Sequence, residues 1–132
     1  MITLDDYFGQ WLMHPDATAE RKTHANALLD KVNALLFEYP GEQHINPQTG
    51  SCVSGATYGG FRPQSCPQGA PHSSHKEGMA IDIYDPHGDL DKWLTDDILT
   101  EYGLYREAPE STSTWTHLTI RAPGSNRRTF FP

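Results

Sequence analysis

Residues 72–84 read His-Ser-Ser-His-Lys-Glu-Gly-Met-Ala-Ile-Asp-Ile-Tyr, and they carry the clearest structural signal in the chain. The segment from Met79 to Tyr84 alternates between residue types, which predicts a β-strand. Gly78 comes directly before this segment and predicts a turn. The stretch therefore places His75 just before a turn and Asp82 within the strand that follows.

Helices are predicted on both sides of this strand. Apolar residues recur at helical spacing from Asp16 to Leu36, and the helix start has capping residues. The predicted buried face consists of Ala25, Leu28, Leu29, Val32, Leu35 and Leu36. A shorter helix is expected around Leu4 to Leu12, and a further helix from Asp89 to Tyr102.

Two more strands are predicted in the second half of the chain. One covers Leu104 to Glu107, and the other covers Trp115 to Ile120 and places His117 on one face. The tail from Pro123 to Pro132 is predicted to be a loop. This order of elements predicts an α+β fold, with a small antiparallel sheet flanked by helices.

The chain has 132 residues, the size of one ordinary domain, and contains no internal repeat or linker. We expect a single domain over residues 1–132, with a helical part at about 1–40 and a metal-binding core at about 53–120. The net charge of −7 argues against a nucleic-acid partner, because such proteins usually present a basic stripe. No stretch approaches the roughly 20 apolar residues of a membrane span. Nothing indicates an obligate dimer, so we expect a monomer.

The N-terminal residues carry no apolar segment of the kind found in signal peptides, so we expect synthesis in the cytoplasm without a signal peptide. In that compartment Cys52 and Cys66 would be two free thiols. A disulfide that closes the loop between them is the alternative if the protein works outside the cell.

His75, Asp82 and His117 form a candidate metal-binding set. Zinc accepts imidazole nitrogen and carboxylate oxygen in tetrahedral geometry, and a catalytic site keeps one position for water. A lone histidine in a strand is more often a core or surface residue, and the chain has seven histidines. Spacing alone therefore leaves the metal interpretation open.

Three motifs add a resemblance to a known family. Residues 73–82 match the pattern S-x-H-x-x-G-x-A-x-D, residues 60–63 match G-[YF]-R-P, and residues 115–117 match W-x-H. In this order they resemble the family of zinc D-alanyl-D-alanine carboxypeptidases and L-alanyl-D-glutamate endopeptidases, and most closely its short phage and prophage members. The matched region spans about residues 53–118.

The resemblance implies a zinc ion (Zn²⁺) held in a cleft by His75, Asp82 and His117, in a fold of the hedgehog and D,D-peptidase type. It also implies that Arg62 binds the carboxylate of the substrate peptide, which suits a planar guanidinium. The alternative for Arg62 is a solvated turn residue. Ser73 either hydrogen-bonds substrate or orients His75, and the alternative is that it serves only the turn.

The general base is the point at which this chain departs from the family. Many members carry a glutamate two or three residues before the last histidine, where this chain has Trp115 and Thr114. Residues 107–117 resemble the E-x-P-x-x-T-x-x-W-x-H segment of the short phage-type members, which indicates Glu107. Glu110, or no base at all, are the alternatives.

The resemblance implies a zinc metallopeptidase that hydrolyses a peptide bond in peptidoglycan stem peptides. The bond would be of the D,D-carboxypeptidase type or the L-Ala-D-Glu endopeptidase type, and the protein would be a phage or prophage lysin that acts on the cell wall. One alternative is a zinc-containing but inactive cell-wall binding or phage structural module. Another is a zinc hydrolase that acts on a different peptide or amide.

Overall fold

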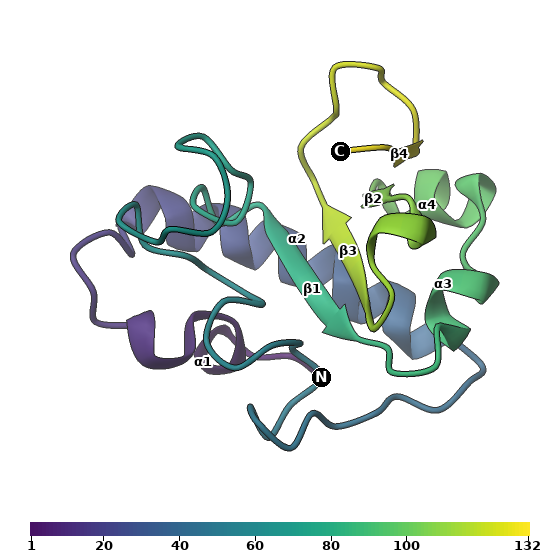
Figure 1. Cartoon of the computed structure of the whole chain (residues 1–132), viewed down its shortest axis with the longest axis horizontal. Helices are drawn as coiled ribbons and strands as arrows, with labels where there is room; N and C mark the ends of the chain where they lie inside the picture. The colour runs from purple at the N-terminus through teal and green to yellow at the C-terminus, as the bar shows by residue number, and fades with distance from the viewer.

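The computed structural model describes residues 1–132 and confirms the α+β class (Figure 1). None of its helices is both long and apolar enough to cross a bilayer. Cys52 and Cys66 are both free thiols.

The elements are, in order, α1 (Leu4–Phe8), η1 (Gly9–Trp11), α2 (Ala19–Glu38), β1 (Ala80–Tyr84), α3 (Asp89–Trp93), α4 (Asp96–Tyr102), β2 (Tyr105–Glu107), η2 (Pro109–Ser111), β3 (Trp115–Thr119) and β4 (Thr129–Phe130).

The sheet has four strands in the order β1-β3-β2-β4. β3 pairs antiparallel with both β1 and β2, as predicted, but β4 pairs parallel with β2, so the sheet is mixed. The C-terminal tail, which was predicted to be a loop, supplies this fourth strand. A strand of two residues has no periodic pattern to detect in sequence. Its pairing depends on backbone hydrogen bonds, including one from Ala108 N to Phe130 O of 2.7 Å.

The hydrophobic core lies between α2 and one face of the sheet. In Figure 1, α2 passes behind β1 and β3. All six apolar residues predicted for its buried face are buried. From the sheet, Ile81 and Leu118 are completely buried in the same cluster. Since side chains alternate along a strand, Asp82 and His117 belong to the opposite face, which is free for a functional site.

The segment predicted as one helix over Asp89 to Tyr102 forms two helices, α3 and α4. The chain is extended at Leu94, with φ −67° and ψ 130°. Thr95 then caps α4, and its side chain accepts a hydrogen bond from Ile98 N at 3.2 Å. In a continuous helix this N–H would bond to a backbone carbonyl of the preceding turn. The threonine side chain accepts from it instead, so the first helix ends before Thr95 and a second helix begins.

The N-terminal helical part contacts β1 directly. The hydroxyl of Tyr7 donates a hydrogen bond of 2.9 Å to the carbonyl of Ala80. Burial raises the pKa of the Tyr7 hydroxyl well above its ordinary value. Phe8 packs against Phe61, with ring centroids 5.0 Å apart. These contacts fix the segment around Phe61 beside the sheet.

A buried polar cluster joins α3 to β2. Arg106 Nη1 lies 2.6 Å from the carbonyl oxygen of Asp91 and 3.4 Å from its Oδ1. Thr112 Oγ1 lies 3.4 Å from Asp91 Oδ2. Burial raises the pKa of Asp91 to about 6, and Arg106 offsets only part of that effect. The cluster fixes the strand that ends at Glu107.

We expect the free energy of unfolding to reflect this raised pKa. Between about pH 4, the ordinary aspartate pKa, and about pH 6, the folded chain binds more protons at Asp91 than the unfolded chain. The contribution of Asp91 to stability is therefore greatest below this range and falls as the pH rises through it. Over this pH range, the free energy of unfolding of the wild type should fall by about 1 kcal/mol relative to that of Asp91→Asn, after discounting for solvent screening.

Urea denaturation at several pH values measures this difference. Asp30→Asn, at an exposed position on α2, is the matched control. The difference between its free energy of unfolding and that of the wild type should stay constant across these pH values. An offset between wild type and Asp91→Asn that does not change with pH would contradict the prediction.

Candidate metal centre

The pairing of β1 with β3 places two of the predicted ligands directly opposite each other. Asp82 is the cross-strand partner of His117, and residues opposite each other in antiparallel strands share a face. His117 Nδ1 lies 2.9 Å from Asp82 Oδ1. His75, from the turn before β1, places its Nε2 3.3 Å from the same oxygen. The structure therefore brings the three predicted ligands together.

The donor atoms of His75, Asp82 and His117 all lie within 4.8 Å of one another. In a tetrahedral zinc site with bonds of about 2.0–2.1 Å, neighbouring donors stand roughly 3.3 Å apart. The observed spacing and the set of two nitrogens and one oxygen fit such an ion. The group can hold a metal ion, and the geometry does not distinguish among the divalent metals.

The orientation of His75 is set by its other ring nitrogen. His75 Nδ1 lies 2.8 Å from the carbonyl oxygen of Gly60, so it must carry the proton and donate. Nε2 is then unprotonated in the neutral ring and points toward Asp82. Burial lowers the pKa of His75, with partial opposition from Asp82, so the neutral form that ligates metals is favoured.

Asp82 is held as a carboxylate although it is buried. Burial alone would raise its pKa, but His75 and His117 together outweigh burial and the pKa is well below its ordinary value. Its second oxygen, Oδ2, lies 3.3 Å from Arg62 Nη2. Arg62 also donates from Nε to the carbonyl of Tyr58 at 2.7 Å. The guanidinium is therefore fixed beside the candidate metal ligands.

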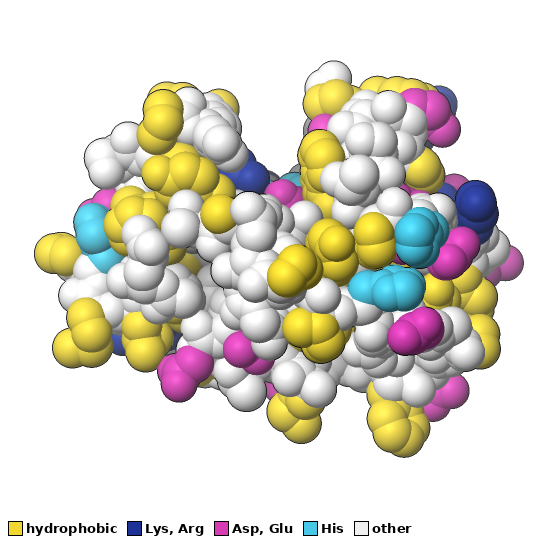
Figure 2. Space-filling model, turned by 60° about the horizontal axis from the view of Figure 1, so that its bottom comes forward, with side chains coloured by type: hydrophobic (Ala, Val, Ile, Leu, Met, Phe, Trp, Pro, Cys, Tyr) yellow, Lys and Arg dark blue, Asp and Glu magenta, His cyan; other side chains and the backbone are white.

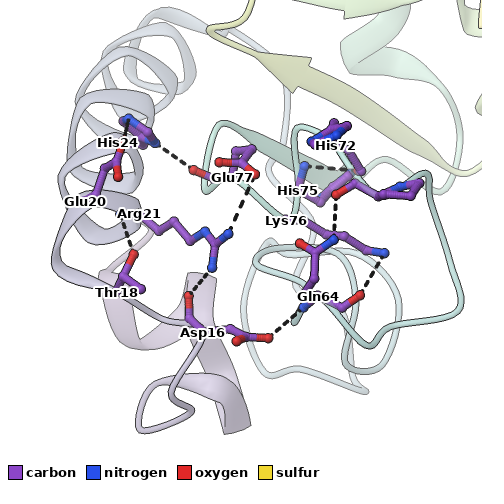
Figure 3. Close-up of polar contacts among 12 residues, drawn as sticks. Asp16, Thr18, Glu20, Arg21, His24, Gln64, His72, His75, Lys76 and Glu77 are labelled. Carbon is purple, nitrogen blue, oxygen red and sulfur yellow. Dashed lines mark hydrogen bonds and ion pairs between the residues drawn. The ribbon is translucent and has the colours of Figure 1, made fainter.

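The loop that carries His75 is tied to the start of α2 (Figure 3). Asp16 Oδ2 accepts a hydrogen bond of 2.8 Å from Gln64 N, and His24 Nδ1 lies 2.8 Å from the carbonyl of Glu77. Lys76 is buried, and its Nζ donates to the carbonyl of Gln64 at 3.2 Å. These contacts hold the loop in one position relative to the sheet, which keeps His75 near Asp82.

Gly78 lets this loop approach α2 closely. Its φ is +74°, and a Cβ at this position would lie 2.5 Å from the carbonyl oxygen of Arg21. We expect Gly78→Ala to lower the free energy of unfolding by about 2–4 kcal/mol, because the left-handed conformation and the displaced helix both cost energy.

Gly88→Ala is the matched control for this substitution. Gly88 has φ +73° but nothing within 4 Å of the added Cβ. It should show only the conformational cost of about 1–2 kcal/mol. Guanidinium denaturation of the two variants compares them, and equal losses would show that contact with α2 contributes nothing.

Glu107 lies in the same pocket as the three candidate ligands. In β2, Tyr105 is opposite Thr119 of β3 and Arg106 is opposite Leu118. Continuing this register by one residue brings Glu107 opposite His117. Asp82, His117 and Glu107 therefore form a row across β1, β3 and β2 on one face. The pocket, of about 290 Å³, is lined by Arg62, Ser73, Ser74, His75, Asp82, Glu107, Trp115, His117 and Phe130.

Glu110, the alternative base, does not line this pocket and is exposed on η2. His72 is also exposed and outside the pocket, and its carbonyl accepts a hydrogen bond from Arg121. Ser73 does line the pocket, and its Oγ also accepts a hydrogen bond of 3.3 Å from His75 N. Of Glu107 and Glu110, the two acids proposed as a base, Glu107 alone lines the pocket.

Phe130 is a pocket residue that the sequence did not identify. Its ring stands edge-on to His117, with centroids 6.1 Å apart and an angle of 89° between the planes. It arrives there because β4 pairs with β2, and no local pattern in the tail signals that pairing.

Figure 2 shows a notch between two raised parts of the surface, with basic, acidic and histidine side chains at its floor.

No protein-family model, no curated protein and no solved structure matches this chain. The functional interpretation therefore depends on the site geometry and on the motifs in the sequence.

Proposed function

We propose that this chain is a zinc-dependent metallopeptidase that hydrolyses a peptide bond in peptidoglycan stem peptides. The observation that carries the proposal is the row Asp82, His117 and Glu107 across three strands, with His75 beside it. The row combines a metal-binding group with a carboxylate in one open pocket. The motif resemblance supplies the family of zinc D,D-carboxypeptidases and L-Ala-D-Glu endopeptidases as the proposed relatives, and peptidoglycan as the substrate.

Zinc is the proposed ion because two neutral imidazoles and one carboxylate are a common catalytic zinc set with room for a further ligand. A bound zinc ion would polarise water and the scissile carbonyl, and so lower the barrier to hydrolysis. His75 has the hydrogen-bonding partner expected for such a ligand, since Gly60 O orients its ring. Arg62 pairs with the second oxygen of Asp82 and keeps that carboxylate in place.

Glu107 is the proposed general base. It is half-buried at the end of β2, and no hydrogen bond fixes its carboxylate to the protein. It can therefore accept a proton from the attacking water and later deliver it to the leaving amine. Arg62 is proposed to bind a substrate carboxylate through the N–H groups that Tyr58 and Asp82 leave free. Ser73 is proposed to contact substrate and to orient His75 through its hydrogen bond to His75 N.

A second candidate is a metal-containing module that binds the cell wall without cutting it. The absence of an acid at Thr114 and Trp115, where many relatives of the proposed family carry one, favours this alternative. In either case we propose that the protein acts on the cell wall as a phage or prophage product.

Metal removal tests the proposed function. Protein loaded with one equivalent of zinc should release new amine groups from purified peptidoglycan. The same protein treated with a chelator should not, and added zinc should restore the release. Zinc bound at one per chain without any amine release would favour the binding module, and release that survives complete metal removal would exclude a metallopeptidase.

A further inference from the structure

A groove, here called the helix groove, lies between the ends of three helices and apart from the metal pocket. Its volume is about 420 Å³, within the range of about 300–1,000 Å³ for ligand pockets. It shares no lining residue with the metal pocket, so the two sites can be occupied independently. Its lining side chains are Glu38 at the end of α2, Trp93 at the end of α3, and Ile98, Glu101 and Tyr102 of α4.

Three of these side chains give the helix groove an apolar surface. Trp93, Ile98 and Tyr102 pack against the edge of the core but are only partly buried, and each also lines the groove. The ring of Trp93 packs against the ring of Tyr39, with centroids 5.2 Å apart. An aromatic face that is fixed in this way can pack against an alkyl chain and attract a cation.

Two carboxylates give the helix groove a negative charge. Glu38 and Glu101 are exposed, and neither forms an ion pair with a basic side chain. Partial burial raises the pKa of the Tyr102 hydroxyl, and the charges of Glu101 and Glu38 raise it further, so both carboxylates act on the same hydroxyl. Lys31 lies close to Gly103 and does not line the groove. No basic side chain of the groove therefore compensates the two charges.

This combination of side chains favours a primary ammonium group on an alkyl chain. Both glutamates would repel an anion, and a neutral apolar ligand would leave their charges without a partner. A lysine-type side chain packs its methylene stem on an apolar surface and keeps its charged end in water. Its three N–H donors match the two carboxylates and the hydroxyl of Tyr102. A guanidinium, by contrast, is best suited to one carboxylate that accepts its planar fork.

We propose that the helix groove binds a primary alkylammonium side chain on a peptide of the bacterial cell wall. The diamino acid of a stem peptide carries such a side chain where the peptide is not cross-linked. The contact holds the protein on the wall and takes no part in hydrolysis, because the groove lies outside the metal pocket. The choice of the wall as the carrier of the amine rests on the proposed function, whereas the choice of an ammonium rests on the groove.

Nuclear magnetic resonance of the full chain tests whether the groove binds an ammonium. The probe is Nα-acetyl-L-lysine methylamide, in which the side-chain amine carries the only charge. The signal is the indole N–H of Trp93, which the Trp93→Phe variant identifies. We expect this signal to shift with a saturable dependence on the probe. The same probe with its side-chain amine acetylated should bind at least about tenfold more weakly.

A double variant tests the two carboxylates. Glu38→Gln/Glu101→Gln removes both charges and nearly keeps the shape of the side chains. Its matched control is Asp30→Asn/Asp97→Asn, which removes one exposed charge from each of the same two helices outside the groove. The first variant should bind the lysine probe at least about tenfold more weakly, and the control should bind it as the wild type does. An equal loss in both would show that only net charge attracts the probe, and would overturn the inference.

Sedimentation with insoluble peptidoglycan tests the carrier of the amine. The protein carries Glu107→Gln, so that the wall stays intact during the measurement. Acetylation of the free amines of the wall should lower the affinity of this protein by about threefold or more. With Glu38→Gln/Glu101→Gln added, native and acetylated walls should bind equally. If acetylation does not change the affinity of the protein with an intact groove, the wall is not the carrier and the inference is overturned.

Failure of this inference can be told apart from failure of the proposed function. If the lysine probe does not shift the Trp93 signal, or if the arginine analogue binds equally well, the inference is overturned. Release of amine from peptidoglycan by the zinc-loaded wild type would still support the proposed function in that case. If the zinc-loaded protein cuts no peptidoglycan, the proposed function fails, while a probe affinity that depends on Glu38 and Glu101 still supports the ammonium site.

Discussion

The His117→Ala variant should lose its affinity for zinc by more than about 100-fold. Loss of an outer partner of a metal ligand typically costs 10–100-fold, and loss of one of three protein ligands costs more. His117 is suited to this test because its ring lies at the cleft and partly outside the core. Competition with a chromophoric chelator measures the affinity, and elemental analysis after dialysis gives the stoichiometry.

His72→Ala is the control, because His72 is three residues from His75 but exposed and outside the metal-binding group. It should bind zinc as tightly as the wild type. Circular dichroism and thermal melting should show that both variants remain folded. Wild-type zinc affinity in His117→Ala would remove His117 from the ligand set and leave the centre with two protein ligands.

The Glu107→Gln variant should keep its zinc and lose activity by about 10²–10⁴-fold, the usual contribution of a general base. Glutamine has nearly the same shape as glutamate but cannot accept the proton. Because Glu107 is outside the metal-binding group, zinc stoichiometry should stay at one per chain. The measurement is kcat for release of amine from peptidoglycan, made on the same preparation as the zinc analysis.

Glu110→Gln is the matched control, since Glu110 lies three residues further along the chain and is exposed outside the pocket. It should retain wild-type kcat. If Glu110→Gln were the inactive variant and Glu107→Gln remained active, the assignment of the base from the strand register would be wrong. If both variants stayed active, the proton would have to leave by another route.

Local patterns in the sequence were sufficient for the longest helix and for the two strands that carry candidate ligands. The six-residue apolar face of α2 and the strands that contain Asp82 and His117 follow from spacing of 3.6 and 2 residues, which side-chain geometry imposes directly. The three ligands could be proposed together only because of the motif resemblance. Spacing by itself left the metal interpretation open, since seven histidines offer several other pairs.

The sequence favoured Glu107 over Glu110 as the base, and the tertiary structure shows that Glu107 lies in the pocket of the candidate ligands. The two residues are three positions apart, and sequence offers only the motif resemblance to choose between them. The register of β2 against β3 decides which one lies near His117. Register depends on the pairing of whole strands, and a shift of one residue would send Glu107 to the other face.

The sequence by itself determined the α+β class, the buried face of α2 and the strands that carry the candidate ligands. The tertiary structure alone decided that Phe130 lines the pocket, that Arg62 pairs with Asp82 and that the helix groove forms between α2, α3 and α4. The physical reason is the range of the interactions. Periodic burial is encoded within one helix or strand, whereas a cleft is formed by segments far apart in the chain, whose contacts exist only once the core has fixed their positions.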